Sequence, residues 1–264
     1  MSVWLLLLSA LIGCGVVMTL VFWFARRVDN YSVVDVAWAY AFAPIAAGYA
    51  AFAGGWPMRR VLLAALAVLW SVRLGSHLFR RVASHHPEED GRYLEMRTRW
   101  KANFAWEMFK FYQIQALSLV ILSVPFLIPS LNSRPELHPL EVAGALLWFI
   151  ALCGETIADA QLAAFKRNPA NRGAVCDRGL WRYSRHPNYF FEWLVWVAFF
   201  VFACGSPWGW ISVLCPAVML HLLLRVTGIP LTEQQALRSR GDAYRRYQQT
   251  TSAFFPWFPR RPAP

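Results

Sequence analysis

Several ionisable residues interrupt apolar stretches of the sequence, and their side chains suit acid–base chemistry and anion binding. Asp35 lies in the stretch Ser32-Val-Val-Asp-Val-Ala-Trp38, and Arg73 lies in the next apolar run. Glu155 and Asp159 are four residues apart, so they share one face of a helix. A charge in hydrocarbon is costly and usually faces a partner or a cavity. We therefore expect these side chains to face a polar chamber. Asp35 could instead cap a helix, and the two acids could pair with a basic residue without any ligand.

The densest polar stretch of the chain runs from Lys166 to Glu192. Its six Lys and Arg residues accompany Asn, Gly and Tyr residues, and Pro187 stands where a helix begins. A helix start presents free N–H groups and a positive dipole end, and guanidinium groups offer paired donors for phosphate. These features predict a surface for a polyanionic ligand that contains an aromatic ring, such as a dinucleotide. The sequence has neither a GxGxxG nor a GxxxxGKS or GxxxxGKT motif, which excludes a Rossmann unit and a P-loop.

Apolar segments long enough to cross a membrane must position these residues. Hydrophobic residues make up 57% of the 264 residues and charged residues only 16%, below the roughly 25% of soluble domains. A spanning helix needs about 20 mostly apolar residues. The sequence predicts seven spans: Val3–Phe24, Ser32–Ala53, Val61–Phe79, Met108–Pro129, Leu140–Phe165, Tyr189–Cys204 and Trp208–Leu224. The first lacks the basic start and cleavage site of a signal peptide, so we expect a retained span. We expect an all-α bundle of seven transmembrane helices that forms a single domain, residues 1–264.

Lys and Arg residues predict the orientation of this bundle. They concentrate in the first, third and fifth predicted loops and from Arg225 onward, whereas the opposite loops hold only Arg59, Arg60 and Arg134. The positive-inside rule therefore places the N-terminus outside and the C-terminus in the cytosol. The net charge of +11 also attracts anionic membrane lipids. We expect no nucleic-acid partner, because no basic helix or aromatic RNA-reading platform accompanies the charge.

The cysteines predict neither a disulfide scaffold nor a metal site. Their number is five, which is odd, and no CxxC or Cys/His spacing fits a structural zinc ion. The sequence shows no internal repeat of the kind that many transporters carry. No obligate protein partner is evident.

One segment, Gly179-Leu-Trp-Arg-Tyr-Ser-Arg-His-Pro-Asn-Tyr189 followed by Glu192, resembles the C-terminal domain of the steroid 5-alpha-reductase superfamily. The resemblance is to the bacterial membrane branch of that superfamily, and it covers most of the chain from Ser32 onward. Further matching motifs are Ser32-x-x-Asp35-x-x-Trp38, Glu89-Asp-x-Arg-Tyr93, Glu155-x-x-x-Asp159, Asn168-Pro-x-Asn-x-Gly173 and Gly228-Ile-Pro-x-x-Glu233.

This resemblance implies a bundle that holds NADPH in a chamber open to the cytosol, in a bacterial inner membrane. It implies reduction of a carbon–carbon double bond conjugated to a ketone, in a steroid-like or other hydrophobic lipid. The cofactor region would lie mainly in residues 153–264. The expected cofactor contacts are Arg73, Glu155, Asp159, Lys166, Asn168, Asn171, Arg172, Leu180, Tyr183, Arg185, His186, Asn188, Glu192 and Glu233.

The resemblance also implies a substrate site, with one departure from the family. The steroid enzymes grip the ketone with a Glu at the start of the second span and a Tyr in the third. Asp35 stands at the position of that Glu, and Trp70 replaces the Tyr. The expected catalytic residues are Asp35 and Tyr189, with Tyr31, Tyr40 and Tyr93 as other candidates for the missing hydroxyl. The expected substrate contacts are Asp35, Trp38, Trp70 and Gln115.

Other functions remain open from the sequence. Isoprenylcysteine carboxyl methyltransferases carry a similar Arg-His-Pro-x-Tyr stretch, so an S-adenosylmethionine-dependent methyltransferase is the main alternative. Its cofactor has no phosphate, which leaves Lys166 and Arg172 with less to bind. A reductase acting on a different double bond, or a lipid-binding or transport protein without turnover, is also possible.

Overall fold

The computed structural model describes residues 1–226 and 228–260, and every regular element in these ranges is helical. Six helical segments are long and apolar enough to cross a membrane. They are Val3–Val28, Val33–Phe52, Pro57–His85, Lys101–Leu131, Pro139–Arg167 and Gly209–Arg240. The all-α, multi-pass membrane prediction is therefore confirmed.

The sixth predicted span, Tyr189–Cys204, falls in a shorter helix. This helix, α8 (Pro187–Ala203), is apolar and has 17 residues. At about 1.5 Å per residue it is about 26 Å long, against roughly 30 Å for the hydrocarbon core of a bilayer. The seventh crossing, and with it the orientation of the termini, stays a prediction.

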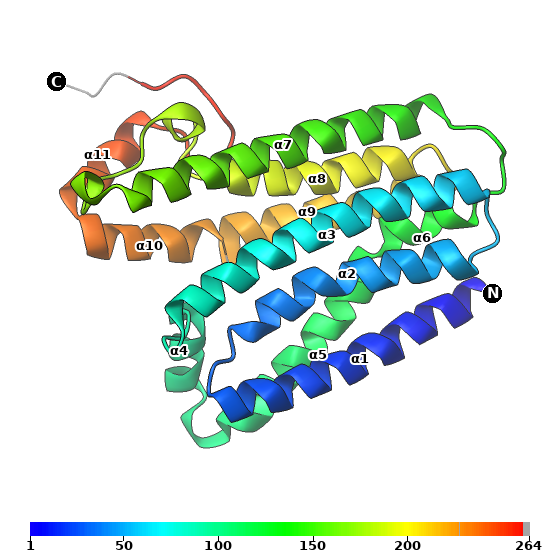
Figure 1. Ribbon diagram of the computed structural model, residues 1–264, viewed down its shortest axis with the longest axis horizontal. Coiled ribbons are helices and arrows are strands. Elements are labelled where there is room, and N and C mark those ends of the chain that lie inside the picture. Colours follow the sequence, from blue (N-terminus) through cyan, green and yellow to red (C-terminus); the bar gives the residue numbers. More distant parts are fainter. Residues whose placement is uncertain (227, 261–264) are drawn as a thin grey trace. The chain divides into compact units, whose positions relative to one another are not determined.

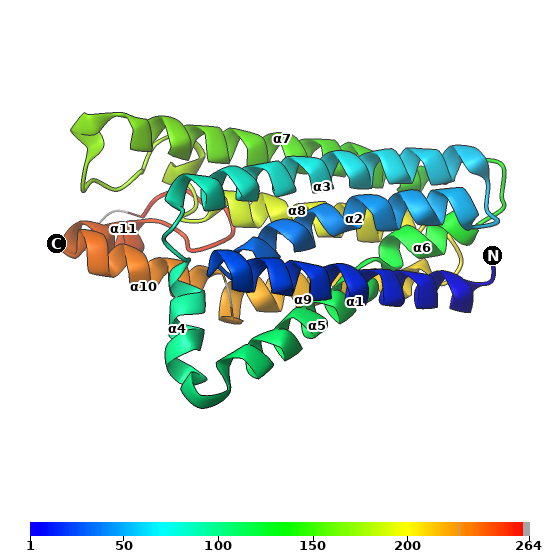
Figure 2. The same cartoon turned by 60° about the horizontal axis from the view of Figure 1, so that its bottom comes forward.

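The chain divides into two compact units, Met1–Pro139 with Ala203–Trp210, and Leu140–Phe202 with Ile211–Pro264. The expected single domain over residues 1–264 stays a prediction. The helices of the first unit are α1 (Val3–Val28), α2 (Val33–Phe52), α3 (Pro57–His85), α4 (Gly91–Arg99), α5 (Phe104–Leu122) and α6 (Val124–Leu131). In this unit α2 packs mainly against α3, and α1 packs against α5 and α2 (Figure 1 and Figure 2).

A proline and a serine shape the contact between α2 and α3. Pro44 lies inside α2 and has no N–H, so the carbonyl group of Tyr40, four residues earlier, loses its helical partner. The buried hydroxyl of Ser71 on α3 donates to the carbonyl oxygens of Ala39 at 2.6 Å and Tyr40 at 3.2 Å. Gly75 continues this contact, because a Cβ there would lie 2.7 Å from the ring of Tyr40. The two helices therefore approach closely around Tyr40, Ser71 and Gly75.

The second unit contains α7 (Pro139–Arg167), most of α8, α9 (Leu214–His221), α10 (Ile229–Arg240) and α11 (Asp242–Thr250). A π-helical turn at Leu222–Val226 follows α9. Between α7 and α8 lies a polar loop with two short three-ten turns, Pro169–Asn171 and Gly179–Arg182. The absence of a side chain at Gly154 lets α7 and α8 approach closely, since a Cβ there would meet the ring of Phe191 at 2.3 Å.

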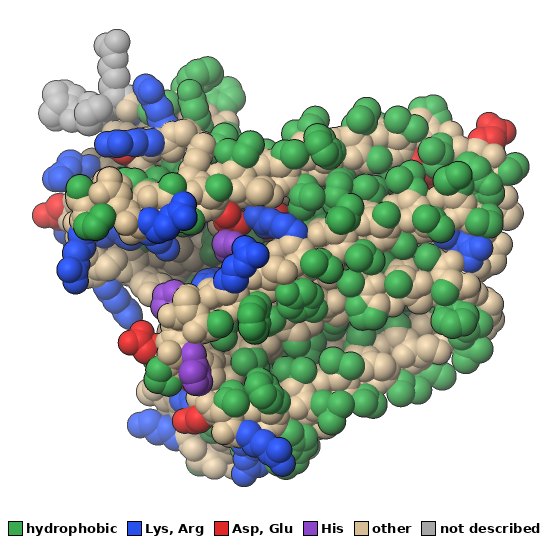
Figure 3. Space-filling model, in the orientation of Figure 1, with side chains coloured by type: hydrophobic (Ala, Val, Ile, Leu, Met, Phe, Trp, Pro, Cys, Tyr) green, Lys and Arg blue, Asp and Glu red, His purple; other side chains and the backbone are tan. Residues whose placement is uncertain are grey.

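Charged side chains gather near the ends of the helices, and apolar side chains cover their lengths. Figure 3 shows charged and His side chains around α4 in the first unit and around α10 and α11 in the second. Hydrophobic side chains cover the visible flanks of α1, α2 and α3 in the same view. This distribution is typical of helices whose middles lie in lipid and whose ends lie in water.

Candidate functional site

Asp35 occupies the first turn of α2 and lies in a cluster of charged and phenolic side chains. Its Oδ2 is 2.5 Å from Nη2 of Arg92 and 3.6 Å from Nη2 of Arg81. Its Oδ1 accepts a hydrogen bond of 2.8 Å from the hydroxyl of Tyr93. The carboxyl group of Asp35 thus accepts from side chains of other elements, whereas Ser32 stands at the N-cap of α2.

Short polar contacts hold α4 against the start of α2. The side chain of Asp90 caps α4 by accepting from the backbone N–H of Arg92, and the hydroxyl of Ser32 accepts from the N–H of Asp90 at 3.0 Å. Oε1 of Glu89 accepts from the N–H of Tyr31 at 2.6 Å, and Oε2 pairs with Arg97 at 2.6 Å. The segment Glu89-Asp-Gly-Arg-Tyr93 therefore positions the groups that bind Asp35.

The surroundings of Tyr93 and Asp90 on α4 shift the pKa of each group and so determine its protonation state. Burial, with the Asp35 carboxylate beside it, raises the pKa of the Tyr93 hydroxyl well above its ordinary value. Burial alone would raise the pKa of Asp90, but the hydrogen bonds and charge of Arg92 outweigh burial and lower it. Tyr93 is therefore a protonated donor at neutral pH, and Asp90 is an anion that shares Arg92 with Asp35.

The predicted substrate residues of the first unit lie near one another. The indole Nε1 of Trp38 donates to Oγ of Ser118 at 3.0 Å, and that hydroxyl lies 3.3 Å from Oε1 of Gln115. The Trp38 ring packs edge-on against Phe42 with centroids 4.8 Å apart, and the Phe42 ring lies 5.2 Å from that of Trp70. Trp70 itself is fully buried. Trp70 therefore contributes to the wall behind Trp38.

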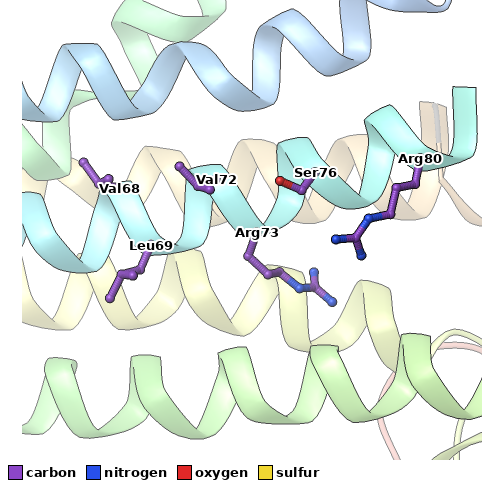
Figure 4. Close-up of a pocket in the computed structure, with 6 residues that line it drawn as sticks. All are labelled: Val68, Leu69, Val72, Arg73, Ser76 and Arg80. Atoms are coloured by element: carbon purple, nitrogen blue, oxygen red, sulfur yellow. The ribbon is translucent and has the colours of Figure 1, made fainter. Parts of the chain in front are cut away.

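Arg73 lies on α3 beside a hollow of about 370 Å³. Figure 4 shows the guanidinium groups of Arg73 and Arg80 reaching toward each other along α3, and Ser76 lies between these two residues along the helix. The apolar residues Val68, Leu69 and Val72 line the rest of the hollow. An anionic group near the arginines and an apolar body beyond them would match this lining.

In the second unit, Arg185 and Glu233 form the centre of a hydrogen-bond network. Nε of Arg185 is 2.6 Å from Oε1 of Glu233, and its Nη1 donates to the carbonyl oxygens of Gln248 and Thr251. The other carboxylate oxygen of Glu233 accepts from the side chain of Gln248 at 2.8 Å. Both predicted cofactor residues are therefore engaged with each other and with the end of α11.

His186 and Tyr189 belong to the same network. Nε2 of His186 lies 3.2 Å from Oε1 of Glu233, so it must be the donor, because a carboxylate only accepts. Burial lowers the pKa of His186, although the neighbouring carboxylate opposes this shift. The ring of Tyr189 stacks on the imidazole at 5.3 Å, and its hydroxyl lies 3.0 Å from that of Thr232. Tyr189 is thus held by contacts within its own unit.

A further set of polar side chains lies where α7 contacts α8. Nδ2 of Asn188, in the first turn of α8, donates to Oδ1 of Asp159 on α7 at 3.2 Å. One turn further, Oε1 of Glu192 accepts from Nε1 of Trp196 at 3.1 Å, and both side chains are buried. Glu155, also buried, lies one turn before Asp159 on α7.

The predicted loop residues divide into those that shape the loop and those that face outward. The side chain of Asn168 accepts from the N–H of Ala170, and that of Asn171 donates to the carbonyl group of Phe165. The N–H of Leu180 donates to the side chain of Gln161 on α7. The exposed predicted residues of this region are Lys166, Asn168, Arg172 and Tyr183.

The structure brings the predicted residues together in two groups. Asp35, Trp38, Trp70, Arg73 and Gln115 belong to the first unit, and the remaining predicted contacts belong to the second. One chamber shared by all of them stays a prediction. Among residues 1–226 and 228–260, no group of three His, Cys, Asp or Glu side chains is placed to hold a metal ion.

Sequence reasoning missed the partners of two predicted residues. Arg92 and Tyr93 stood only as part of a motif and a list of candidates, yet they bind Asp35 directly. Gln248 and Thr251, which hold Arg185, were not considered. Only the Glu-Asp-x-Arg-Tyr spacing signalled the first pair, and no local pattern signalled the second.

Comparison with known proteins places the chain in a family. No solved structure matches it. The uncharacterized protein C594.04c of Schizosaccharomyces pombe is 27% identical over 229 residues, which covers 75% of this chain and 63% of the relative. The chain thus spans less than two thirds of that relative's length. Residues 21–251 match the model of a family described as "Protein of unknown function (DUF1295)". The chain therefore belongs to this DUF1295 family, which is related to steroid 5-alpha-reductase-like membrane proteins.

Proposed function

We propose that the chain is an NADPH-dependent membrane reductase. Its reaction would be hydride transfer to a carbon–carbon double bond conjugated to a ketone, in a steroid-like or other hydrophobic lipid. The observation that carries the proposal is the Asp159–Asn188 contact between α7 and α8, at the base of a loop with exposed basic side chains. The relation of the family to steroid 5-alpha-reductase-like proteins agrees with it.

The residues of the second unit fit a phosphorylated nicotinamide cofactor. A carboxylate beside an amide can accept from and donate to the nicotinamide carboxamide, and in this proposal Asp159 and Asn188, which contact each other, take these roles. Lys166 and Arg172 are exposed and suit the phosphate groups, including the 2′-phosphate that distinguishes NADPH from NADH. Arg185, His186 and Glu233 bind one another, so in this proposal they hold the loop in place. Bound NADPH would supply the hydride.

The residues of the first unit fit the other half of the chemistry. Reduction of an enone places negative charge on the ketone oxygen, and positioned donors stabilise that charge. Arg92 is such a donor, because its guanidinium group has further N–H groups beside the one that lies 2.5 Å from Asp35. Tyr93 donates its one O–H to Asp35 at 2.8 Å and would turn it toward the ketone when the substrate binds. Tyr93 supplies the phenolic hydroxyl that the third span lacks, where Trp70 stands. Trp38 and Gln115 would contact the body of the lipid.

We also propose how the chain is oriented in the membrane. The proposal has seven spans, an external N-terminus and an active site open to the cytosol of a bacterium. Its support is a hydrogen bond of 2.9 Å from Asn132 to Ser206, both in the first unit. Asn132 follows the fourth predicted span and Ser206 follows α8. Two loops that meet in this way lie on the same side of a membrane, so α8 crosses if α7 does.

A thermal-shift measurement of the detergent-solubilised protein tests the cofactor. NADPH should raise the melting temperature more than NADH or S-adenosylmethionine does, because a ligand at about 100 times its Kd stabilises the folded state by about 2.7 kcal/mol. Asn188→Ala and Arg172→Gln should reduce the NADPH shift. Arg238→Gln is the matched control, since this exposed arginine lies on α10. Stabilisation by S-adenosylmethionine alone would refute the reductase and favour the methyltransferase.

A further inference from the structure

A short segment after α11 exposes three large aromatic side chains. Phe255, Trp257 and Phe258 are 54%, 69% and 75% exposed. They lie within four consecutive positions, and Pro256 stands between the first two. Large apolar side chains that are exposed next to one another mark a site of interaction with a membrane or a partner. These residues are not part of the proposed cofactor or substrate site.

Backbone hydrogen bonds hold this segment in one place on the second unit. The N–H of Trp257 donates to the carbonyl oxygen of Tyr183 at 2.9 Å, and the N–H of Arg260 donates to that of Thr250 at 2.8 Å. The hydroxyl of Ser184 donates to the carbonyl oxygen of Phe254 at 2.8 Å. The aromatic side chains are therefore presented outward by an ordered backbone.

The segment lies at the level where the second unit changes from polar to apolar. The ring of Phe255 is 6.0 Å from that of Phe190 and 5.7 Å from that of Trp193, both in the first two turns of α8. The loop before α8 is polar and basic, and α8 itself is apolar. Aromatic rings concentrate at this depth in membrane proteins, because one part of the ring is in hydrocarbon and the other is near water.

A hollow of about 460 Å³ lies between these aromatic residues and α11. Its lining includes Phe255, Trp257 and Phe258, the amides of Gln248 and Gln249, and Arg260, and none of its lining residues is acidic. The charge of Arg185, which also lines it, is paired with Glu233. The side chain of Arg260 forms no ion pair with any residue of the described ranges. The hollow therefore combines one available cation with an apolar rim.

We propose that the segment 252–260 is an interfacial anchor whose hollow binds the phosphate of an anionic phospholipid. Arg260 binds the headgroup phosphate, and Trp257 and Phe258 enter the boundary between headgroups and acyl chains. The same chemistry would suit a soluble phosphate or a nucleotide. The exposed aromatic rim favours the lipid, because a soluble anion leaves Trp257 and Phe258 in water.

Photo-crosslinking in the full-length chain tests the contact with lipid. Benzoylphenylalanine is placed at position 258 in place of Phe258, and the protein is irradiated in lipid nanodiscs. We expect an intact-mass increase equal to one phospholipid. The same probe at position 245, in place of the exposed Arg245 on α11, is the control and should give no such adduct. Absence of a lipid adduct at position 258 overturns the proposal.

The second arm tests the headgroup. In nanodiscs with equal amounts of phosphatidylglycerol and phosphatidylcholine, we expect about a fivefold excess of the anionic adduct, the factor typical of one basic residue near an anionic surface. Arg260→Gln should remove this excess, whereas Arg246→Gln on α11 should keep it. Equal adducts in the parent chain overturn the anionic preference. Loss of the adduct on addition of inorganic phosphate or NADPH shows that the hollow takes a soluble phosphate and overturns the lipid as its occupant.

Discussion

At the scale of single residues, Asp35 is the clearest departure from an isolated acidic residue in a membrane span. Its carboxylate is shared between a phenol and two guanidinium groups, and its side chain is only 18% exposed. A carboxyl group with these partners accepts their hydrogen bonds and orients them. In the proposed reaction, the hydrogen-bond donor to the ketone is therefore Tyr93 or Arg92.

Substitution of Asp35 separates these roles. Asp35→Asn removes the charge that faces Arg92, so we expect the free energy of unfolding to fall by about 1.5–3 kcal/mol, the range for hydrogen bonds to charged groups. Tyr93→Phe removes one donor to the same carboxylate and should also cost about 1.5–3 kcal/mol. Both variants should lose turnover of an enone substrate and keep the thermal shift caused by NADPH. Loss of that shift in Asp35→Asn would instead show that Asp35 maintains the structure of the cofactor site.

The residues themselves were easier to predict than their partners. A charge inside an apolar run is visible in the sequence, and it selected Asp35, Arg73, Glu155 and Asp159. Arg92, which binds Asp35, is 57 positions away on a separate helix, and no local pattern specifies that contact. The predicted roles of Arg185 and Glu233 as cofactor contacts stay untested. Their mutual contact arises from tertiary packing, which spacing along the chain does not reveal.

At the scale of the elements, the hydropathy pattern located helices better than it located their ends. The third span was predicted as Val61–Phe79, but α3 runs from Pro57 to His85. Pro57 suits the first turn of a helix, and arginines continue a helix beyond the apolar run. The fourth predicted span divides near Ser123, because Pro125 cannot donate to the helix and starts α6 instead. Propensity and proline chemistry, and not hydropathy, determine these ends.

The packing of α7 on α8 gives a prediction for an element. A Cβ on Gly144 would lie 2.6 Å from the backbone N of Phe202 and 2.8 Å from the carbonyl oxygen of Ala198. Backbone atoms cannot move away as a side chain can, so Gly144→Ala must push the helices apart. We expect it to lower stability by about 1–3 kcal/mol, as overpacking does.

A matched glycine is the control for this prediction. Gly48 lies inside α2, and a Cβ there would meet nothing within 4 Å. Gly48→Ala should raise stability by about 0.5–1 kcal/mol, because alanine favours the helix. Thermal unfolding of both variants, followed by circular dichroism in one detergent, measures the difference. A Gly144→Ala protein as stable as the parent would show that α7 and α8 are not in close contact.

At the scale of the whole molecule, composition was enough to predict an integral membrane protein. A chain with 57% hydrophobic and 16% charged residues cannot form an ordinary soluble domain, and six long apolar helices agree with that prediction. Composition cannot decide whether α8 crosses, because a helix of 17 residues lies near the limit for a span. The proposal that α8 crosses rests instead on which loops meet.

Three loops of the first unit lie together. The N–H of Trp56 donates to the carbonyl oxygen of Asn132 at 2.9 Å, and Nδ2 of Asn132 donates to Oγ of Ser206 at 2.9 Å. The loops after α2, after α6 and after α8 therefore contact one another, and the proposed topology places them on one side of the membrane. The first two carry few basic residues, which the positive-inside rule assigns to the outside. In the topology that we propose, the basic loop before α8 lies inside and α8 connects the two sides.

Cysteine labelling of intact bacterial cells tests this topology. Pro207→Cys, in the exposed loop after α8, should react with a membrane-impermeant maleimide added outside. Arg172→Cys, in the exposed basic loop, should react only after the membrane is permeabilised. The parent chain, with its own five cysteines, measures the background. Protection of both positions would mean that α8 returns to the side on which it began. The N- and C-termini would then share one side, and with six crossings the positive-inside argument would fail for this chain.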